Sequence, residues 1–426
     1  MNIFRIQGGA KLSGQLEVPG SKNTALAILS AVVLVEGEVT LTNVPELSDT
    51  RYKAELLRRF GAKVVWREGS MFIDCSGIHD GDADEEIVRS IRTSFYMLGP
   101  LLARNGKVSL PAPGGCQIGA RPVDFHLKGL SQLGAEVVLD GGIYHATTEK
   151  LVGAEIYLDF PSAGATQHLM ATAVLAEGVT TITNAATEPE VVSLASFLNQ
   201  VGARIEGAGT SKITIMGVQR LDGGKFRVPA DRVQAATFLM AGAITNGDVQ
   251  VNGIEPEHQT ALLTKLKESG AEVTEGHDWV RVKAKGRLKA TDVITMPYPG
   301  FPTDYQQPMA ALLATSDGVS VIEETIYESR IGHVQELNRM GANIRLEGKV
   351  AFITGVEKLK GAVVHASDLR AGASLVLAGL SAEGETIVKN IHFIDRGYVA
   401  FEQNLTNLGA RIERVKVADN EFAVGE

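Results

Sequence analysis

Apolar and polar residues are arranged along the chain in two recurring patterns, and each pattern predicts a different kind of helix. In the first, apolar positions recur at helical spacing among charged ones and end at a Gly-Ala pair, as in residues 55–60 before Gly61. In the second, nearly every position is apolar, as in residues 25–35. A helix that is apolar on all sides is typically buried, whereas a helix with one apolar stripe covers a core. An alternating stretch such as residues 38–42 follows the apolar helix and predicts a strand.

Both patterns occur six times, about 70 residues apart, which indicates a chain built from repeats. We expect the glycine of each Gly-Ala pair to cap a polar-faced helix, at Gly61, Gly134, Gly202, Gly270, Gly341 and Gly409. A second series of glycines is expected to end the apolar helices, at Gly37, Gly106, Gly178, Gly247, Gly318 and Gly384. Each repeat is therefore predicted to hold two helices and about four short strands in a βαβαββ-like order, which is an α/β architecture.

The two halves of the chain also match each other. Residues 16–22 read Leu-Glu-Val-Pro-Gly-Ser-Lys, and residues 226–232 read Phe-Arg-Val-Pro-Ala-Asp-Arg. Each segment precedes an apolar helix, so we expect the chain to cross between two globules there, with three repeats in each. This predicts one domain at 22–229 and a second at 1–21 plus 230–426, with the active site in the cleft between them. A single closed ring of six repeats is the alternative that the spacing leaves open.

Composition and charge narrow the class of protein. The chain has 426 residues, 44% of them hydrophobic, and a net charge of −9 with a pI of about 5.6. An acidic chain argues against nucleic-acid binding. The start of the chain carries no apolar signal region, and residues 25–35 are far shorter than the ~20 apolar residues of a membrane span. We therefore expect a cytoplasmic protein without membrane association.

Four of the six apolar helices carry a cation at the same position in their first turn, namely Lys22, Arg92, Arg232 and Arg370. A helix N-terminus already has partial positive charge, so a cation there is disfavoured by up to ~1 kcal/mol unless an anion compensates. Helix N-termini with fixed cations form phosphate or carboxylate sites, although pairing with carboxylates of the protein would also explain some of them. We favour a ligand for the set as a whole. The six equivalent positions are Lys22, Arg92, Gly164, Arg232, Asp304 and Arg370.

The segment 111–126 carries one of only two cysteines in a stretch rich in proline and glycine. Two prolines and three glycines favour a shaped surface loop over a strand. Cys116 in this loop is a candidate for acid or nucleophile chemistry, and the charge of Arg121 would favour its thiolate and suit an anionic substrate. A small buried side chain is the equal alternative. Cys75 lies in an alternating stretch and is expected in a strand. No CxxC or HExxH motif occurs, so we expect neither a disulfide framework nor a metal site.

Motifs along the whole chain resemble the enolpyruvyl transferase family of the EPSP synthase type, and within it the UDP-N-acetylglucosamine 1-carboxyvinyltransferases. These motifs are residues 114–124, Lys22-Asn23, residues 301–304, residues 368–370 and residues 394–398. The resemblance implies an inside-out α/β barrel in each of two domains. It also implies transfer of the enolpyruvyl group of phosphoenolpyruvate to the 3′-hydroxyl of UDP-N-acetylglucosamine, the committed step of peptidoglycan synthesis.

The resemblance implies roles for single residues. Cys116 would be the general acid that protonates the vinyl carbon, would form an adduct with phosphoenolpyruvate and would be the target of fosfomycin. Asp304 would accept the proton of the sugar hydroxyl, which is a poor nucleophile until that proton leaves. Phosphoenolpyruvate would be bound by Lys22, Asn23, Arg121, Arg370 and Arg396, with Lys22 and Arg396 also in catalytic roles.

The resemblance further implies contacts with the nucleotide sugar, from Arg92, Arg121, Pro122, Val123, Asp124, Phe125, Ser162, Ala163, Gly164, Asp304 and Ile326. Phe160 replaces a basic residue of some members, so no charged contact is expected from that position. The resemblance implies no cofactor, and we expect a monomer. Two alternatives remain. One is enolpyruvyl transfer to shikimate 3-phosphate, whose enzymes lack the Cys116 loop. The other is a non-catalytic repeat scaffold, which would need no cations at its helix ends.

Overall fold

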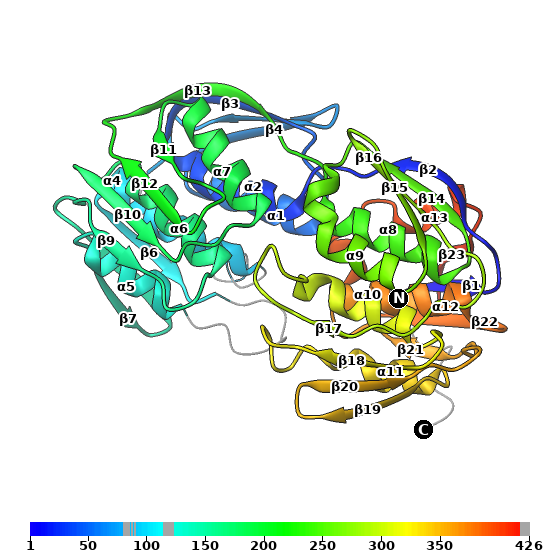
Figure 1. The fold of residues 1–426 in the computed structure, drawn as a ribbon. Helices are drawn as coiled ribbons and strands as arrows, with labels where there is room; N and C mark the ends of the chain where they lie inside the picture. The colour runs from blue at the N-terminus through cyan, green and yellow to red at the C-terminus, as the bar shows by residue number, and fades with distance from the viewer. Residues whose placement is uncertain (80–85, 87, 89–90, 114–122, 418–426) are drawn as a thin grey trace. The chain divides into compact units, whose positions relative to one another are not determined.

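A computed structural model describes residues 1–79, 86, 88, 91–113 and 123–417. The described chain forms two compact units (Figure 1). The first unit holds residues 1–18 and 231–417, and the second holds residues 19–113 and 123–230. The chain therefore leaves and re-enters the first unit beside the two matching Val-Pro segments.

Helices of the second unit alternate between the two predicted kinds. Among its helices, α1, α4 and α6 are buried over most of their length, whereas α2, α5 and α7 each expose one face. Their bounds are α1 (Lys22–Ala31), η1 (Val32–Leu34), α2 (Ser48–Arg59), η2 (Arg92–Met97), α4 (Leu98–Asn105), α5 (Asp124–Gln132), α6 (Ala163–Ala173) and α7 (Pro189–Gln200).

The first unit repeats this alternation. Every residue of α8 is buried, and α8, α10 and α12 pack against one another as its inner helices. The polar-faced helices are α9, α11 and α13. The bounds are α8 (Arg232–Ile244), η3 (Pro256–Gln259), α9 (Thr260–Glu268), α10 (Thr303–Leu313), α11 (His333–Arg339), α12 (Leu369–Ser381), η4 (Ile394–Arg396) and α13 (Phe401–Asn407).

Within the described residues the strands form six small sheets, three in each unit, and five of them share one plan. An edge strand pairs in parallel with a central strand, which in turn pairs with one strand of an antiparallel pair. The second unit holds β13-β3-β5-β4, β6-β8-β7 and β11-β12-β10-β9, with bounds β3 (Val35–Thr42), β4 (Lys63–Arg67), β5 (Ser70–Asp74), β6 (Lys107–Pro111), β7 (Glu136–Asp140), β8 (Ile143–Thr147), β9 (Glu155–Tyr157), β10 (Val179–Thr183), β11 (Arg204–Glu206), β12 (Lys212–Met216) and β13 (Leu221–Arg227).

The sheets of the first unit are β15-β16-β14-β2, β17-β18-β20-β19 and β21-β22-β1-β23. In the last of these, the N-terminal strand β1 lies between two strands from the end of the chain. The bounds are β1 (Asn2–Gln7), β2 (Ser13–Glu17), β14 (Asp248–Asn252), β15 (Glu272–Glu275), β16 (Trp279–Lys283), β17 (Val293–Ile294), β18 (Val319–Glu323), β19 (Asn343–Glu347), β20 (Val350–Thr354), β21 (Val363–His365), β22 (Glu385–Lys389) and β23 (Arg411–Lys416).

The pattern of buried and exposed residues shows that each unit has an inner layer of helices and an outer layer of sheets. Strands such as β8 and β12 alternate exposed and buried residues, so each sheet has one face toward solvent and one toward the inner helices. The predicted α/β architecture of six repeats, with helices inside and sheets outside, is confirmed. Within the described residues the sheets remain separate and do not join into one closed, hydrogen-bonded barrel.

The two series of repeat glycines behave differently. The Gly-Ala glycines all adopt the left-handed conformation that caps a helix, with φ between 87° at Gly341 and 111° at Gly202. In the second series, only Gly106 directly ends its helix, α4. Gly37 lies inside β3 instead, because the β-branched run that begins at Val32 closes α1 through a 3₁₀ turn. The prediction that these glycines end the apolar helices was therefore wrong for most repeats.

Candidate active site

The six equivalent positions all lie at the start of an inner helix or of the turn that leads into it. Lys22, Arg92 and Arg232 are the first residues of α1, η2 and α8. Gly164, Asp304 and Arg370 are the second residues of α6, α10 and α12. Four of these helices have a side-chain cap that accepts backbone N–H groups, from Ser21, Ser162, Asp231 and Asp368.

Asp304 lies between two buried arginines in the first unit. Arg330 Nη1 donates to Asp304 Oδ1 at 2.7 Å, and Arg370 Nη2 and Nε donate to Oδ2 at 3.2 and 3.3 Å. The arginine side chains are 5% and 3% exposed, and the Asp304 side chain is 26% exposed. Arg330 also donates to Thr303 Oγ1 at 3.1 Å. Asp304, Arg330 and Arg370 together form a cluster, the Asp304 trio, with a net positive charge at the start of α10.

The charges of this trio set the ionisation of Asp304. Burial alone would raise the pKa of the carboxyl group, but the positive charges of Arg330 and Arg370 outweigh burial and hold the pKa far below its ordinary value. The pKa of Arg370 is raised, although burial lowers it, because Tyr398 and Asp304 favour the charged guanidinium. The guanidinium also lies 5.3 Å from the centre of the Tyr398 ring. All three groups are therefore ionised at every working pH.

A buried carboxylate holds the loop beside this trio. Glu324 accepts hydrogen bonds from the hydroxyl groups of Thr295 at 2.9 Å and Thr303 at 2.8 Å. It also accepts from the backbone N–H of Ile326 at 2.8 Å. Glu324 therefore fixes the backbone at Ile326, which the resemblance assigns to the nucleotide sugar.

Lys22 in the second unit has a carboxylate partner of its own. Its Nζ lies 2.8 Å from Asp49 Oδ2, near the start of α2, and the two side chains are only 12% and 5% exposed. Lys22 and Arg370 thus have carboxylates of the protein as partners. The alternative that carboxylates of the protein pair with some of these cations is therefore confirmed for these two residues, and a ligand for the set stays a prediction.

A cluster of rings lies beside the start of α6 in the same unit. The rings of Tyr96 and His126 are stacked with centroids 5.4 Å apart. A Cβ atom on Gly164 would lie 2.2 Å from the Tyr96 hydroxyl oxygen. Only glycine therefore fits at this position without displacing Tyr96.

The remaining predicted residues have varied surroundings. Asn23 and Asp124 are exposed, and Val123 and Phe125 are half-buried at the start of α5. Ser162 caps α6 by accepting from the Ala165 N–H, and Ala163 follows it. Arg396 ends η4 and is half-buried. Cys116, Arg121 and Pro122 lie outside the described residues, so their predicted roles stay predictions.

The other cysteine is a core residue. Cys75 follows β5 directly and is completely buried. Burial raises the pKa of its thiol to about 12. A neutral, inaccessible thiol is a poor nucleophile, so Cys75 is unsuited to chemistry.

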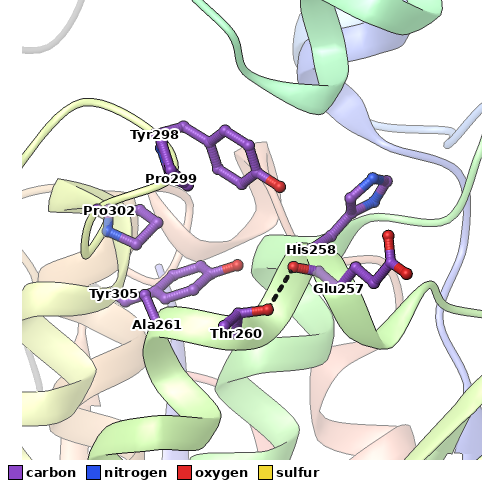
Figure 2. A pocket seen from close by; sticks show the side chains of 9 residues that line it. Glu257, His258, Thr260, Ala261, Tyr298, Pro299, Pro302 and Tyr305 are labelled. Atoms are coloured by element: carbon purple, nitrogen blue, oxygen red, sulfur yellow. Dashed lines mark hydrogen bonds between the residues drawn. The ribbon is translucent and has the colours of Figure 1, made fainter. Parts of the chain in front are cut away.

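A hollow of about 210 Å³ opens in the first unit (Figure 2). Tyr298 and Tyr305 line it together with the first turn of α9, where Thr260 Oγ1 donates to the Glu257 carbonyl at 2.8 Å. The Arg232 guanidinium lies 5.4 Å from the centre of the Tyr298 ring. None of the residues predicted from the sequence as substrate contacts lines this hollow.

Sequence reasoning missed several residues whose side chains contact the predicted site residues. Arg330 and Asp49 pair with Asp304 and Lys22, but neither lies at a repeat-equivalent helix start. His126 directly follows the predicted contact Phe125, and its partner His168 lies on α6. A polar residue inside an otherwise apolar helix, as at His168, was the available signal.

Within the described part of the chain, no group of three or more metal-ligating side chains converges. None of its helices has the length and apolar character needed to span a bilayer.

Comparison with known proteins identifies the class. Residues 6–405 match the family model of EPSP synthase (3-phosphoshikimate 1-carboxyvinyltransferase). Because the match spans most of the chain, the chain belongs to this family.

Similar curated proteins narrow the resemblance. The chain is 52% identical over 417 residues to UDP-N-acetylglucosamine 1-carboxyvinyltransferase 2 of Carboxydothermus hydrogenoformans, covering 97% of this chain and 100% of the relative. It is 49% identical over 418 residues to UDP-N-acetylglucosamine 1-carboxyvinyltransferase of Yersinia pestis, covering 98% and 100%.

Solved structures share the fold. The enolpyruvyl transferase NikO from Streptomyces tendae has a TM-score of 0.89 and 25% identity, with 98% of this chain and 99% of the other covered. EPSP synthase from Acinetobacter baumannii has a TM-score of 0.76 and 22% identity, covering 98% and 100%, which supports the fold alone.

Proposed function

We propose that this chain transfers the enolpyruvyl group of phosphoenolpyruvate to the 3′-hydroxyl of UDP-N-acetylglucosamine and releases phosphate, in the first committed step of peptidoglycan synthesis. One observation carries the proposal: relatives with this activity in their names are about half identical to the chain over nearly the full length of both. The chain is a transferase that needs neither a cofactor nor a metal. We further propose that it acts as a monomer in the cytoplasm.

The chemistry is an addition followed by an elimination. The sugar hydroxyl oxygen bonds to the central carbon of phosphoenolpyruvate while Cys116 gives a proton to the vinyl carbon. Protonation turns the vinyl carbon into a methyl group. This methyl group then loses a proton and the central carbon loses phosphate, which restores the double bond. Negative charge grows on the carboxylate and phosphate during this sequence, and Lys22, Asn23, Arg121, Arg370 and Arg396 stabilise it.

Asp304 receives the proton of the sugar hydroxyl. With both of its oxygens bound by guanidinium groups, it is a weak base, because those charges hold its pKa far below the working pH. The substrate hydroxyl must therefore replace at least one arginine contact before Asp304 accepts a proton. This gives Arg330 a positioning role: it holds the carboxylate in place while the Arg370 contact is exchanged for substrate.

The nucleotide sugar is bound by the starts of several helices. We assign these contacts to Arg92, Val123, Asp124, Phe125, the turn at residues 162–164, Asp304 and Ile326. Arg121 and Pro122 complete the set. The start of α6 suits a diphosphate, because the N–H groups at a helix N-terminus and the positive end of the helix dipole favour anions.

The substrate test is a phosphate-release assay with phosphoenolpyruvate and either UDP-N-acetylglucosamine or shikimate 3-phosphate. We expect turnover with the nucleotide sugar alone. The second acceptor is included because the family model is named for that reaction. Turnover only with shikimate 3-phosphate would reject the proposal, and turnover with neither acceptor would favour a non-catalytic role.

Fosfomycin should distinguish the two cysteines. We expect the epoxide to alkylate Cys116 and to leave Cys75 unmodified, because Cys75 is buried and its thiol keeps its proton up to about pH 12. Peptide mass spectrometry after native labelling measures both sites, and labelling in urea provides the control in which Cys75 becomes accessible. Native modification of Cys75 would contradict the assignment.

A further inference from the structure

Two buried histidines of the second unit are joined by a direct hydrogen bond. The Nδ1 atoms of His126 on α5 and His168 on α6 are 2.9 Å apart. On its other side, His168 Nε2 accepts the backbone N–H of Gly99 on α4, also at 2.9 Å. His126 is 6% exposed and His168 is 1% exposed. The chain of contacts therefore runs from α4 through α6 to α5.

These contacts allow only one arrangement of protons. Because His168 Nε2 accepts from Gly99, the proton of a neutral His168 must lie on Nδ1. That proton is donated to His126 Nδ1, which must then be the bare nitrogen of its ring. A neutral His126 consequently carries its proton on Nε2.

Both rings are neutral in this environment. Burial and, to a smaller extent, the nearby charge of Arg92 lower the pKa of His126 to about 3. Burial also lowers the pKa of His168 well below its ordinary value, as do His126 and Lys53. The phenol rings of Tyr96 and Tyr144 lie in the same cluster. A proton on either imidazole would also break one of the two hydrogen bonds.

The remaining N–H of His126 is left for a ligand. Among the described residues, the hydrogen bond of His126 uses Nδ1 alone, so Nε2–H has no acceptor there and is available to a ligand. His126 lies in the first turn of α5, directly after the proposed contacts Asp124 and Phe125. Its ring stacks on Tyr96, whose hydroxyl group abuts Gly164 at the start of α6.

We propose that Gly99, His168 and His126 form a hydrogen-bond relay that fixes an Nε2–H donor on His126, and that this donor binds an anionic oxygen of the ligand at the start of α6. His168 is a positioning residue, because it acts on the ligand only through His126. The ligand part rests on the proposed function, so the relay and the ligand contact are tested separately.

Nitrogen-detected NMR of histidine-labelled protein tests the relay without any ligand. His168 should show the Nδ1–H tautomer and His126 the Nε2–H tautomer, and both should stay neutral from pH 5 to 8. Spectra of His126→Gln and His168→Gln assign the two signals. The opposite tautomers, or a protonation midpoint above pH 5 for either ring, would overturn the relay.

Two substitutions at position 168 separate its two hydrogen bonds. The amide of His168→Asn replaces Nδ1 and keeps the donor to His126, whereas the longer amide of His168→Gln replaces Nε2 and keeps only the acceptor for Gly99. We expect His126 to retain its Nε2–H tautomer in the asparagine variant and to sample both tautomers in the glutamine variant. Identical His126 spectra in the two variants would overturn the relay.

Calorimetric titration with UDP-N-acetylglucosamine tests the ligand contact. We expect His168→Gln to weaken binding about tenfold, the usual effect of one hydrogen bond to a charged group, with kcat unchanged. His145→Gln is the matched control, because it removes an exposed histidine hydrogen bond to Ser109 from the same unit. Unchanged affinity in His168→Gln would overturn the contact. Wild-type protein that binds no nucleotide sugar would instead reject the proposed function and leave the NMR result for the relay standing.

Discussion

Replacing Asp304 by asparagine should lower turnover by roughly 10² to 10⁴, the usual contribution of one acid–base group. It should also destabilise the first unit by about 3 kcal/mol, because the change leaves Arg330 and Arg370 buried without their counter-charge. Steady-state phosphate release measures the first effect, and urea unfolding at pH 7 measures the second. Binding of UDP-N-acetylglucosamine should persist.

The pH dependence of this effect has a defined sign. The folded-state pKa of Asp304 is depressed, so its stabilising effect is complete above the ordinary aspartate value of 3.8 and is lost only as the pH falls below it. The unfolding difference between wild type and variant should therefore be constant from pH 5 to 8. Asp248→Asn is the control, since the exposed pair of Asp248 with Arg281 should contribute at most ~1 kcal/mol. Near-wild-type turnover in Asp304→Asn would reject Asp304 as the base.

Replacing Cys116 by serine should nearly abolish turnover, whereas replacing it by aspartate should leave measurable activity. A free thiol titrates near 8.5 and a free aspartic acid near 3.9, so both can donate a proton within an accessible pH range, and a hydroxyl cannot. Nearby cations lower both values, so the aspartate variant should lose activity on the alkaline side at a lower pH than wild type. It should also resist fosfomycin.

Rate–pH profiles of the two Cys116 variants test this assignment. Full activity in Cys116→Ser would show that position 116 does not donate the proton. A folded but inactive Cys116→Asp would indicate that the covalent adduct with phosphoenolpyruvate is obligatory. Circular dichroism of both variants provides the control for folding.

The repeat architecture could be predicted because its signals are local. A Gly-Ala pair after an apolar stripe marks a helix end within a few residues, and a helix without a polar face must be buried. The ends of the inner helices were less predictable, because the competition between helix and strand in a run such as residues 32–35 is decided by the neighbouring strands.

The partners of the candidate residues could not be predicted. Sequence equivalence placed Asp304 and Arg370 at similar helix starts, but the packing of α10 against α12 decides that they touch. Arg330 and Asp49 lie outside the repeat-equivalent positions, so no periodic signal marked them. The pairing of Lys22 with Asp49 shows that one anion beside this helix start belongs to the chain, which helix electrostatics alone could not reveal.

The position of β1 has a consequence for synthesis on the ribosome. Residues 19–230 are continuous, so the second unit is able to form as soon as it has emerged. The first unit waits, because β1 pairs with β22 and β23 at the other end of the chain. At typical translation speeds, β1 is made roughly 20 to 80 s before these partners. Ile3, Phe4 and Ile6 are all fully buried in the folded protein. During this delay they lack both the partner strands β22 and β23 and the core residues against which they pack. Until its partners are made, the unpaired β1 segment is therefore more open to aggregation than the centre of the nascent chain.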